Sequence, residues 1–290
     1  MMQDVPRSSA GMDLLNGAFR HIPPGMKGKA RLARFVLSRR QRARAACVDD
    51  RFGNLMVIPS LLDPVGLHVW MDGAYEPETL KFLRQYVTSD TVFLDIGANI
   101  GVFAIPMARY AKKVVAIEPS PQVLPFLKRN VELNNLNNVA IVECAASGPD
   151  SDSVPLYLPP ASHFGMASSA AQFNIEPITV RAKSLNTILQ EQGVTVVSVM
   201  KIDVEGFEAE VILGAANLLY SASPPPIVFE FCDWAEERAF PGKKGLAQTL
   251  LMDAGYWLWT LPDHLRCRPP LGFPITEGAH SIVAIPRSMA

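Results

Sequence analysis

The sequence predicts an α/β fold: a doubly wound, mostly parallel sheet of seven strands with an inserted hairpin. The first observation is that short runs rich in Val, Ile and Phe alternate with helix-like segments from residue 91 to residue 285. Such alternation predicts a parallel sheet whose strands are joined by crossover helices. The second observation is that these runs contain few polar residues, as expected for strands covered on both faces.

Hydrophobic periodicity and turn signals place the individual elements. The strands of the sheet are expected at 91–96, 113–118, 139–144, 197–203, 226–231, 255–260 and 281–285. The helices between them are expected at 103–110, 121–134, 184–191, 206–219 and 244–254. Ahead of the sheet we expect a basic helix at 28–46, short strands at 47–50 and 54–58, and a helix from Glu76 to Tyr86.

The alternation breaks between residues 145 and 183. Residues 154–158 and 178–180 have strand character, and a small, polar stretch lies between them. We interpret the segment as an inserted hairpin with a long loop. Long loops in compact domains are often functional.

Bulk properties limit the classes of function. The formal net charge of −1 argues against a dedicated nucleic-acid binder. The four cysteines are scattered without zinc spacing, which favours a reducing, cytoplasmic setting and no structural metal. We find neither a secretory signal nor an apolar run long enough for an integral membrane segment.

The N-terminal region is distinguished by its charge. Nine Lys or Arg residues and no acidic residue occur between Arg20 and Arg44. We therefore divide the chain into an N-terminal arm with a basic helix (1–46) and a main domain (47–290). The basic helix could be solvated and packed on the main domain, or it could bind a membrane surface, an acidic partner or a phosphorylated substrate.

The run from Thr91 to Gly101 is the most informative motif. A strand ends on Asp95 and turns through glycines into a helix, which is typical of a nucleotide-cofactor site. The dinucleotide pattern Gly-x-Gly-x-x-Gly fails because Asn99 and Val102 occupy its second and third glycine positions. The Asp-x-Gly-x-Asn-x-Gly pattern of an S-adenosylmethionine loop fits instead.

Glu118 lies about 20 residues further on, at the end of the next strand. A carboxylate at that position can accept hydrogen bonds from both ribose hydroxyls. This feature alone would suit NAD equally well. Just after the third strand, Cys144 and Ala145 are expected beside the adenine ring, and Glu143 could meet its amino group.

Charged residues also mark the ends of later strands. Lys201, Asp203 and Glu205 would share one face, so Asp203 and Glu205 are expected to face the reactive end of the cofactor. Alternatively, Lys201 and Asp203 form an ion pair. Glu230 and Asp233 could join Asp203 in an oxygen-rich site that magnesium would accept, although we do not expect a metal. A substrate hydrogen bond or an inert strand-end carboxylate is the alternative for Glu230.

Three histidines are further candidates for a catalytic base. His163 has the strongest claim because it lies in the inserted loop. His68 and His280 have no comparable support.

Four ordered motifs together resemble the FkbM-type methyltransferases. They are Gly73-Ala74-Tyr75-Glu76-Pro77, Asp95-Ile96-Gly97-Ala98-Asn99-Ile100-Gly101, Glu118-Pro119 and Lys201-Ile202-Asp203-Val204-Glu205-Gly206. The resemblance covers roughly residues 45–285. It implies a class I (Rossmann-like) fold, S-adenosylmethionine as donor, and methylation of a hydroxyl on a sugar, polyketide or other secondary metabolite.

The resemblance also implies roles for individual residues. The implied cofactor-binding residues are Asp95, Gly97, Ala98, Asn99, Gly101, Glu118, Pro119 and Asp203, with Glu76 closing over the cofactor. The resemblance places Asp203 and Glu205 toward the methyl group or the acceptor. From the chemistry of methyl transfer, rather than from the resemblance, we expect Asp203 or Glu205 to accept the proton of the hydroxyl, with His163 as a further choice. One departure from the expected pattern is Pro106, which could delay or bend the helix after the cofactor loop.

Two alternatives to this function remain open. One is a non-catalytic protein that binds S-adenosylmethionine or a partner on the same fold. The other is an NAD-dependent enzyme. The sequence names neither the small-molecule acceptor nor the oligomeric state, so a homo-oligomer is also open.

Overall fold

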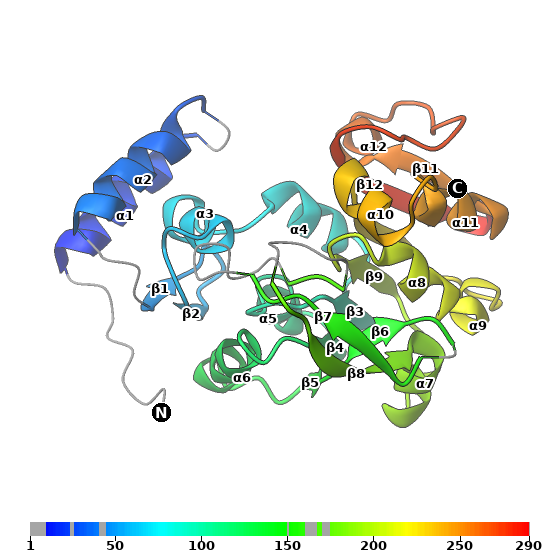
Figure 1. Cartoon of the computed structure of the whole chain (residues 1–290). Coiled ribbons are helices and arrows are strands. Elements are labelled where there is room, and N and C mark those ends of the chain that lie inside the picture. The colour runs from blue at the N-terminus through cyan, green and yellow to red at the C-terminus, as the bar shows by residue number, and fades with distance from the viewer. Residues whose placement is uncertain are drawn as a thin grey trace.

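The computed structural model describes residues 10–23, 26–40, 45–149, 151–159, 167–169 and 175–289. Its centre is a seven-stranded sheet with the order β11-β12-β10-β9-β3-β4-β5 (Figure 1). The strands are β3 (Val92–Ile96), β4 (Lys113–Ile117), β5 (Val139–Val142), β9 (Val199–Ile202), β10 (Ile227–Cys232), β11 (Tyr256–Thr260) and β12 (Ala279–Pro286). β12 runs antiparallel to both of its neighbours, whereas β10, β9, β3, β4 and β5 are mutually parallel. The predicted fold class is confirmed.

Alternate residues of each strand enter two separate apolar cores, one on each face of the sheet. Phe93 and Val199 belong to the first core, and Leu94 and Met200 belong to the second. The first core includes residues of α3 (Pro64–Asp72), α4 (Pro77–Leu83), α5 (Ala104–Ala108), α6 (Leu124–Leu133) and α12 (Leu261–Leu265). The second includes residues of α7 (Leu185–Glu191), α8 (Glu208–Leu213), α9 (Ala216–Leu219) and α11 (Leu246–Asp253). The sheet is therefore doubly wound.

The register of the central strands brings distant charged residues together. Asp95 on β3 pairs directly with Lys201 on β9. The ladder continues one step beyond the strands, where the Asp203 N–H donates to the Ile96 carbonyl at 2.9 Å. Loops that leave the carboxyl ends of adjacent parallel strands consequently meet at one edge of the sheet.

The inserted segment forms a separate three-stranded sheet. β7 (Ser153–Leu156) and β8 (Ile178–Ser184) pair antiparallel, which confirms the expected hairpin. A third strand, β6 (Ala145–Ser147), adds parallel to β8 and was not predicted.

Two predicted helices are wrong in part. The helix expected at 206–219 is divided into α8 and α9, and a Cβ at Gly214, between them, would lie 2.0 Å from the Ser147 carbonyl oxygen. The backbone therefore approaches β6 too closely for an ordinary side chain. The basic helix expected at 28–46 ends earlier, because α2 spans Lys29–Arg40 and β1 begins at Ala46. Four further helices were not predicted, namely α1 (Ala10–His21), α3, α10 (Asp233–Ala239) and α12.

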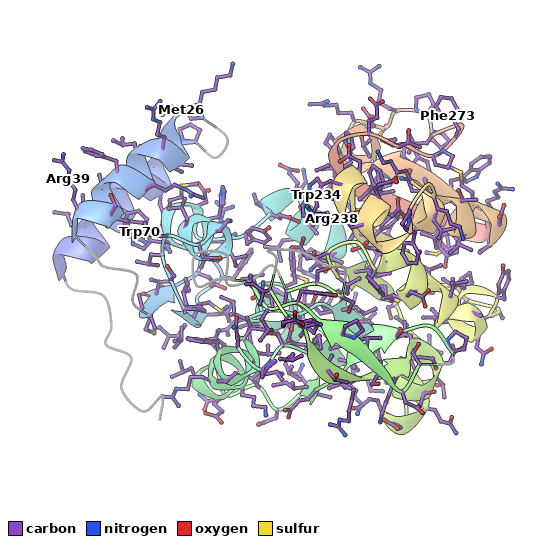
Figure 2. All side chains as sticks on the ribbon, in the orientation of Figure 1. Met26, Arg39, Trp70, Trp234, Arg238 and Phe273 are labelled. Atoms are coloured by element: carbon purple, nitrogen blue, oxygen red, sulfur yellow. The ribbon has the colours of Figure 1, made fainter. Side chains whose placement is uncertain are left out.

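The N-terminal region packs on α3. The region contains α1 (Ala10–His21), α2 and the antiparallel pair β1 (Ala46–Asp49) and β2 (Leu55–Ile58). The rings of Phe19 and Trp70 have centroids 5.2 Å apart, and Lys29 Nζ lies 2.5 Å from Asp72 Oδ1. Figure 1 shows α1 and α2 beside α3, and Figure 2 labels Trp70. The division of the chain at residue 46 stays a prediction. Among the described helices, none combines the length and apolarity needed to cross a bilayer.

Candidate active site at the carboxyl edge of the sheet

The loop after β3 touches the loop after β9. Gly97 has φ +76°, and a Cβ built on it would lie 1.8 Å from the Asp203 carbonyl oxygen. Glycine is required here both for its backbone conformation and for this close approach. Asn99 also has a positive φ, of +52°, and its side chain accepts a hydrogen bond from the Ile100 N–H at 2.8 Å. The loop from Gly97 to Gly101 is therefore held by a close backbone contact and by the Asn99 side chain.

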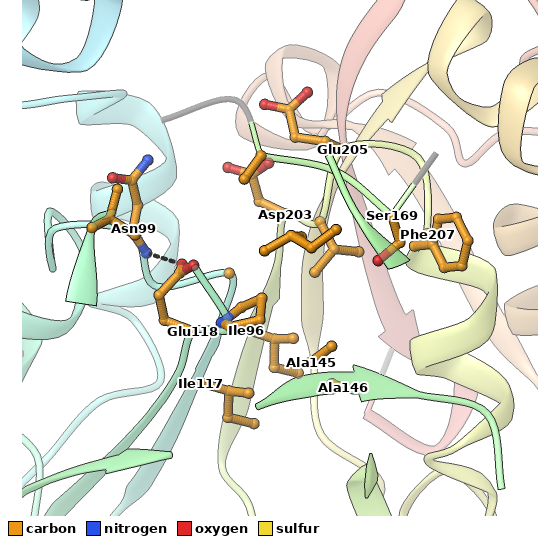
Figure 3. A pocket seen from close by; sticks show the side chains of 16 residues that line it. Ile96, Asn99, Ile117, Glu118, Ala145, Ala146, Ser169, Asp203, Glu205 and Phe207 are labelled. Atoms are coloured by element: carbon orange, nitrogen blue, oxygen red, sulfur yellow. Dashed lines mark hydrogen bonds between the residues drawn. The ribbon is translucent and has the colours of Figure 1, made fainter. Parts of the chain in front are cut away.

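Glu118 fastens this loop to the end of β4. One carboxylate oxygen accepts from the Asn99 N–H and the other from the Ser120 N–H, both at 2.8 Å (Figure 3). Burial raises the pKa of Glu118 to about 7, although these two hydrogen bonds act in the opposite direction. A carboxylate has about four acceptor positions, so Glu118 can still accept bonds from a ligand.

A narrow pocket lies beside Glu118, with a volume of about 50 Å³. Its lining includes Glu118 and Asn99 (Figure 3). The apolar side chains of the lining come from the sheet, the insertion and the starts of α6 and α8, namely Ile96, Ile117, Ala146, Leu156, Val123 and Phe207. Ser169 of the inserted loop also lines it. We name this cavity the first pocket.

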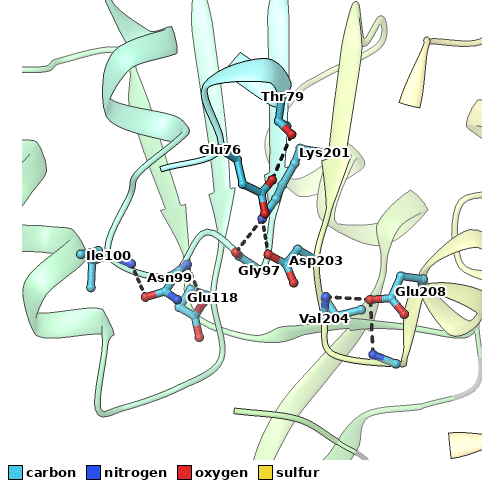
Figure 4. A network of polar contacts seen from close by, with 11 residues as sticks. Glu76, Thr79, Gly97, Asn99, Ile100, Glu118, Lys201, Asp203, Val204 and Glu208 are labelled. Atoms are coloured by element: carbon cyan, nitrogen blue, oxygen red, sulfur yellow. Dashed lines mark hydrogen bonds and ion pairs between the residues drawn. The ribbon is translucent and has the colours of Figure 1, made fainter. Parts of the chain in front are cut away.

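Lys201 is the buried cation of the site. Its Nζ lies 2.9 Å from Asp203 Oδ2, 3.5 Å from the Gly97 carbonyl oxygen and 4.7 Å from the centre of the Phe103 ring (Figure 4). Burial alone would lower the pKa of Lys201, but the charges of Asp203 and Asp95 raise it overall. The ion pair considered from the sequence is present.

Asp95 lies on β3, next to Lys201 in the sheet. Its side chain is fully buried, and burial raises its pKa to about 6, while the charge of Lys201 opposes that rise. Ala98 and Gly101 are likewise buried, and none of these three residues lines the first pocket. A Cβ at Gly101 would lie 2.9 Å from Ile105 and Leu127, so this glycine serves packing.

Asp203, Glu205 and Glu230 form a carboxylate cluster. Oxygen atoms of the three side chains lie within 4.8 Å of one another. The charge of Asp203 is the largest cause that raises the pKa of Glu230, to about 9, followed by burial. Burial, and then the charge of Asp203, raises the pKa of Glu205 to about 8. Mutual repulsion in a partly buried position therefore favours protonation of the cluster or binding of a cation.

Two neighbouring glutamates shape the surroundings of this cluster. Glu76 has φ +41° at the start of α4 and accepts from Thr79 Oγ1 at 3.0 Å. Burial and the charge of Asp203 raise its pKa. Glu208 Oε1 accepts from the Val204 N–H at 3.0 Å and so holds the loop that carries Glu205 (Figure 4).

A wider second pocket of about 300 Å³ opens on the other side of the cluster. Its lining combines aromatic and apolar side chains with carboxylates, namely Pro64, Val65, Tyr75, Phe103, Trp234, Asp203, Glu205 and Glu230. Gly97, Asn99, Asp203 and Glu205 line both pockets. The two pockets therefore adjoin at Asp203 and Glu205.

The structure brings seven of the fourteen expected catalytic and cofactor-binding residues to the first pocket. Gly97, Asn99, Glu118, Pro119, Ala145, Asp203 and Glu205 line the first pocket. Glu143 is instead about half exposed and pairs with Lys128 at 2.7 Å, and Cys144 is buried outside the lining. The geometry does not support the adenine contacts expected for Glu143 and Cys144.

The expected histidines and Asp233 are placed differently. His163 lies outside the described residues. His68 Nδ1 is 3.0 Å from Asp72 Oδ2, and His280 Nε2 is 3.1 Å from the Glu277 carbonyl oxygen. Asp233 is partly exposed and accepts from the Gly278 N–H at 2.9 Å, so Glu205 takes its expected place in the carboxylate cluster.

Several residues that line the pockets were not predicted from the sequence. Tyr75 lies in the second pocket, where burial and the charge of Glu76 raise the pKa of its hydroxyl. Its position in the Gly73–Pro77 motif could have indicated that Tyr75 belongs to the site. Trp234, Val65 and Phe207 had no such signal, because loops and short helices place them.

Fold and site together define a class of protein: an α/β domain of the class I methyltransferase type, with its pockets at the carboxyl ends of the central strands. The methyltransferase FkbM domain model matches residues 95–264. The chain therefore belongs to the FkbM methyltransferase family.

Individual relatives agree with this family. Methyltransferase sdnD of Sordaria araneosa is 31% identical over 157 residues, which cover 43% of this chain and 61% of the relative. Hexuronic acid methyltransferase AglP of Haloferax volcanii is 26% identical over 164 residues, which cover 51% and 59%. The chain thus matches less than two thirds of either relative. A solved precorrin-6y C5,15-methyltransferase of Geobacter metallireducens is 17% identical, with a TM-score of 0.42 and coverage of 73% and 87%.

Proposed function

We propose that this chain transfers a methyl group from S-adenosylmethionine to a hydroxyl oxygen of a small molecule. The observation that carries the proposal is the pair of pockets that adjoin at Asp203 and Glu205. Transfer between two bound molecules requires their reacting groups to be held close and aligned. Two adjoining pockets with carboxylates at their boundary suit that requirement.

The residues of the first pocket suit the proposed donor. Apolar side chains such as Ile117, Val123 and Leu156 would enclose the adenine ring, and Glu118 would accept bonds from the ribose hydroxyls. When bound, S-adenosylmethionine supplies an electrophilic methyl group attached to a positively charged sulfur. The negative charge of Asp203 at the pocket boundary favours a cation there, and the raised pKa of Glu205 reflects the same charge.

The chain's own residues would handle the proton of the acceptor. Asp203 is the main candidate to accept it, because Lys201 holds its carboxylate at the boundary. Glu205 is the second candidate, and His163 remains a candidate outside the described residues. A positioned base of this kind typically contributes about 10²–10⁴-fold to the rate.

The second pocket favours a neutral, hydroxylated acceptor. Tyr75, Phe103 and Trp234 offer apolar ring surfaces, while Glu205 and Glu230 can accept hydrogen bonds from hydroxyl groups. Repulsion from Asp203, and from Glu205 and Glu230 when they lose their protons, would oppose an anionic acceptor. Neutral sugars and polyketides therefore suit the pocket better than a hexuronic acid, which is the substrate class in the name of the Haloferax relative.

The test is a methyl-transfer screen with the purified chain. Neutral sugars, polyketides and matched uronic acids would be incubated with S-adenosylmethionine, and S-adenosylhomocysteine and the methylated product would be measured together. Product from a neutral acceptor supports the proposal. Tight binding of S-adenosylmethionine without product from any acceptor would favour the non-catalytic alternative.

Two control measurements separate the remaining alternatives. Heat protection by NAD, but not by S-adenosylhomocysteine, would favour an NAD-dependent enzyme. Loss of activity with EDTA and recovery with magnesium would assign Asp203, Glu205 and Glu230 to a metal site. Activity that is indifferent to EDTA leaves them as proton-handling and charge-stabilising groups.

A further inference from the structure

The outer face of the N-terminal helix α2 is both basic and apolar. Arg31, Leu32, Arg34, Phe35 and Arg39 are all exposed. Residues three and four apart on a helix are neighbours, so Leu32, Phe35 and Arg39 form one stripe, with Arg31 and Arg34 at its side. The Arg39 guanidinium lies 4.3 Å from the centre of the Phe35 ring.

The inner face of the same helix already accounts for its packing. Ala33 and Leu37 are completely buried, and Lys29 is buried against Asp72 of α3. The outer residues are therefore not needed to attach α2 to the rest of the protein. Their apolar character needs another explanation.

Exposed apolar side chains gather on this part of the molecule. Leu14 of α1 is 78% exposed, Met26 in the connection between the helices 50%, Leu32 51% and Phe35 53%. Met26 and Arg39 mark two ends of the helical pair in Figure 2. Scattered single exposures are ordinary, but a concentration of this kind indicates an interaction surface.

The charge of this surface limits its partner. Between Arg20 and Arg44 the sequence has nine basic residues and no acidic one, although the whole chain has a net charge of −1. The positive charge is thus localised on one region. A partner must offer a dense negative charge together with an apolar layer that accepts Leu32 and Phe35.

We propose that the α1–α2 pair binds the surface of an anionic lipid bilayer. Met26, Leu32 and Phe35 would enter the boundary between headgroups and acyl chains, while Lys27, Arg31, Arg34 and Arg39 contact the anionic headgroups. Binding of this kind is peripheral and needs no helix that crosses the bilayer.

The experiment is co-sedimentation of the full chain with vesicles. Vesicles of phosphatidylcholine alone would be compared with vesicles that also contain phosphatidylglycerol, at low and at high salt. We expect binding only to the anionic vesicles, with a partition coefficient that falls as salt is added.

Three variants separate charge from apolar insertion. Each arginine contributes about fivefold to the partition coefficient, so R31Q/R34Q/R39Q should bind on the order of 100-fold more weakly. The partition coefficient of L32S/F35S should fall by a similar factor, although this variant keeps all the positive charge. The matched control is F273S, because Phe273 is 78% exposed and lies at the other end of the molecule (Figure 2).

Several outcomes would overturn the proposal. Absence of binding by the folded parent chain, or equal binding by the parent and both helix variants, would exclude this surface as the contact. Vesicle binding lost in F273S but not in L32S/F35S would place the contact elsewhere. A change of oligomeric state in the helix variants, with no effect of vesicles, would assign the surface to a second copy of the chain.

Discussion

Glu118 at the end of β4 and the carboxylate cluster of Asp203, Glu205 and Glu230 at the ends of β9 and β10 are separated by β3 and are held in opposite ways. Each oxygen of Glu118 accepts a backbone N–H, so protein dipoles stabilise its ionised form. The cluster carries three carboxylates beside a single buried lysine that contacts Asp203. Glu118 is satisfied within the protein, whereas the cluster is left under mutual repulsion.

This difference assigns different tasks to the two regions. A carboxylate fixed by backbone groups presents a constant hydrogen-bond pattern, which suits recognition of a cofactor. In Glu205 and Glu230 the charge of Asp203 adds to burial in raising the pKa, and carboxyl groups under such repulsion readily exchange protons or attract cations, which suits the proposed chemistry. Substitutions in the two regions should therefore affect binding and turnover separately.

The largest effect is expected at Gly97, which joins the two regions. Gly97→Ala places a Cβ against the Asp203 carbonyl oxygen and should abolish cofactor binding or folding. Gly193→Ala is the matched control, because Gly193 has φ +62° with nothing within 4 Å of a built Cβ. The control should cost only about 1–2 kcal/mol of stability. Chemical denaturation and calorimetric titration measure both effects. Equal costs at the two positions would show that the contact with Asp203 is unimportant.

The next effect concerns the cluster. Asp203→Asn should lower kcat by about 10²–10⁴-fold with little change in cofactor affinity, because it removes the proposed proton acceptor. Asp233→Asn, one strand away and outside the cluster, should leave kcat unchanged. Glu205→Gln belongs in the same series. If Asp203→Asn loses the cofactor instead, the cluster is part of the binding region and our division is wrong.

Glu118→Ala should weaken the binding of S-adenosylmethionine by about 1.5–3 kcal/mol for each charge-assisted hydrogen bond that is lost. The kcat at saturating cofactor should change much less. The cofactor loop also loses its attachment at Asn99, so stability must be measured alongside affinity. Isothermal titration gives the affinity. An unchanged dissociation constant in a folded variant would remove Glu118 from the cofactor site.

Stability should depend on pH through Glu230. Its pKa rises from 4.5 in the unfolded chain to about 9 in the folded protein. The folded state therefore binds the proton more tightly, and this contribution to stability is lost as pH rises from about 4.5 through about 9. Glu230→Gln should flatten the decline of Tm across this range and raise Tm at pH 9. Glu277→Gln, at an exposed position, should change neither, and a parallel decline in parent and Glu230→Gln would contradict the assignment.

The smallest effect is expected at Glu143. Its ion pair with Lys128 is exposed, so Glu143→Ala should change stability by less than about 1 kcal/mol and cofactor affinity not at all. A clear loss of affinity, measured by the same titration as for Glu118, would show that the bound state brings Glu143 to the adenine.

The fold was largely predictable because its signals are local. Apolar runs and their alternation with helices identified all seven strands of the sheet, and the cofactor loop followed from residue types at fixed spacing. The helix predicted at 206–219 is instead interrupted at Gly214, where the backbone of Ser147, far away in sequence, leaves no room for a side chain. The short helices α3 and α10 were not predicted, because tertiary packing stabilises helices that are too short to show a clear hydrophobic period in the sequence.

By itself, the sequence determined the parallel sheet, the Asp95–Gly101 loop, Glu118 at the next strand end and the Lys201–Asp203 pair, since strand pattern and residue spacing encode them. Only the tertiary structure decided that Glu205 rather than Asp233 joins Asp203 and Glu230, and that Glu143 points to Lys128. Side-chain direction after a strand depends on loop conformation, such as the φ of +55° at Glu205. The second pocket is likewise a tertiary property, because Val65, Tyr75 and Trp234 reach it from three separate segments.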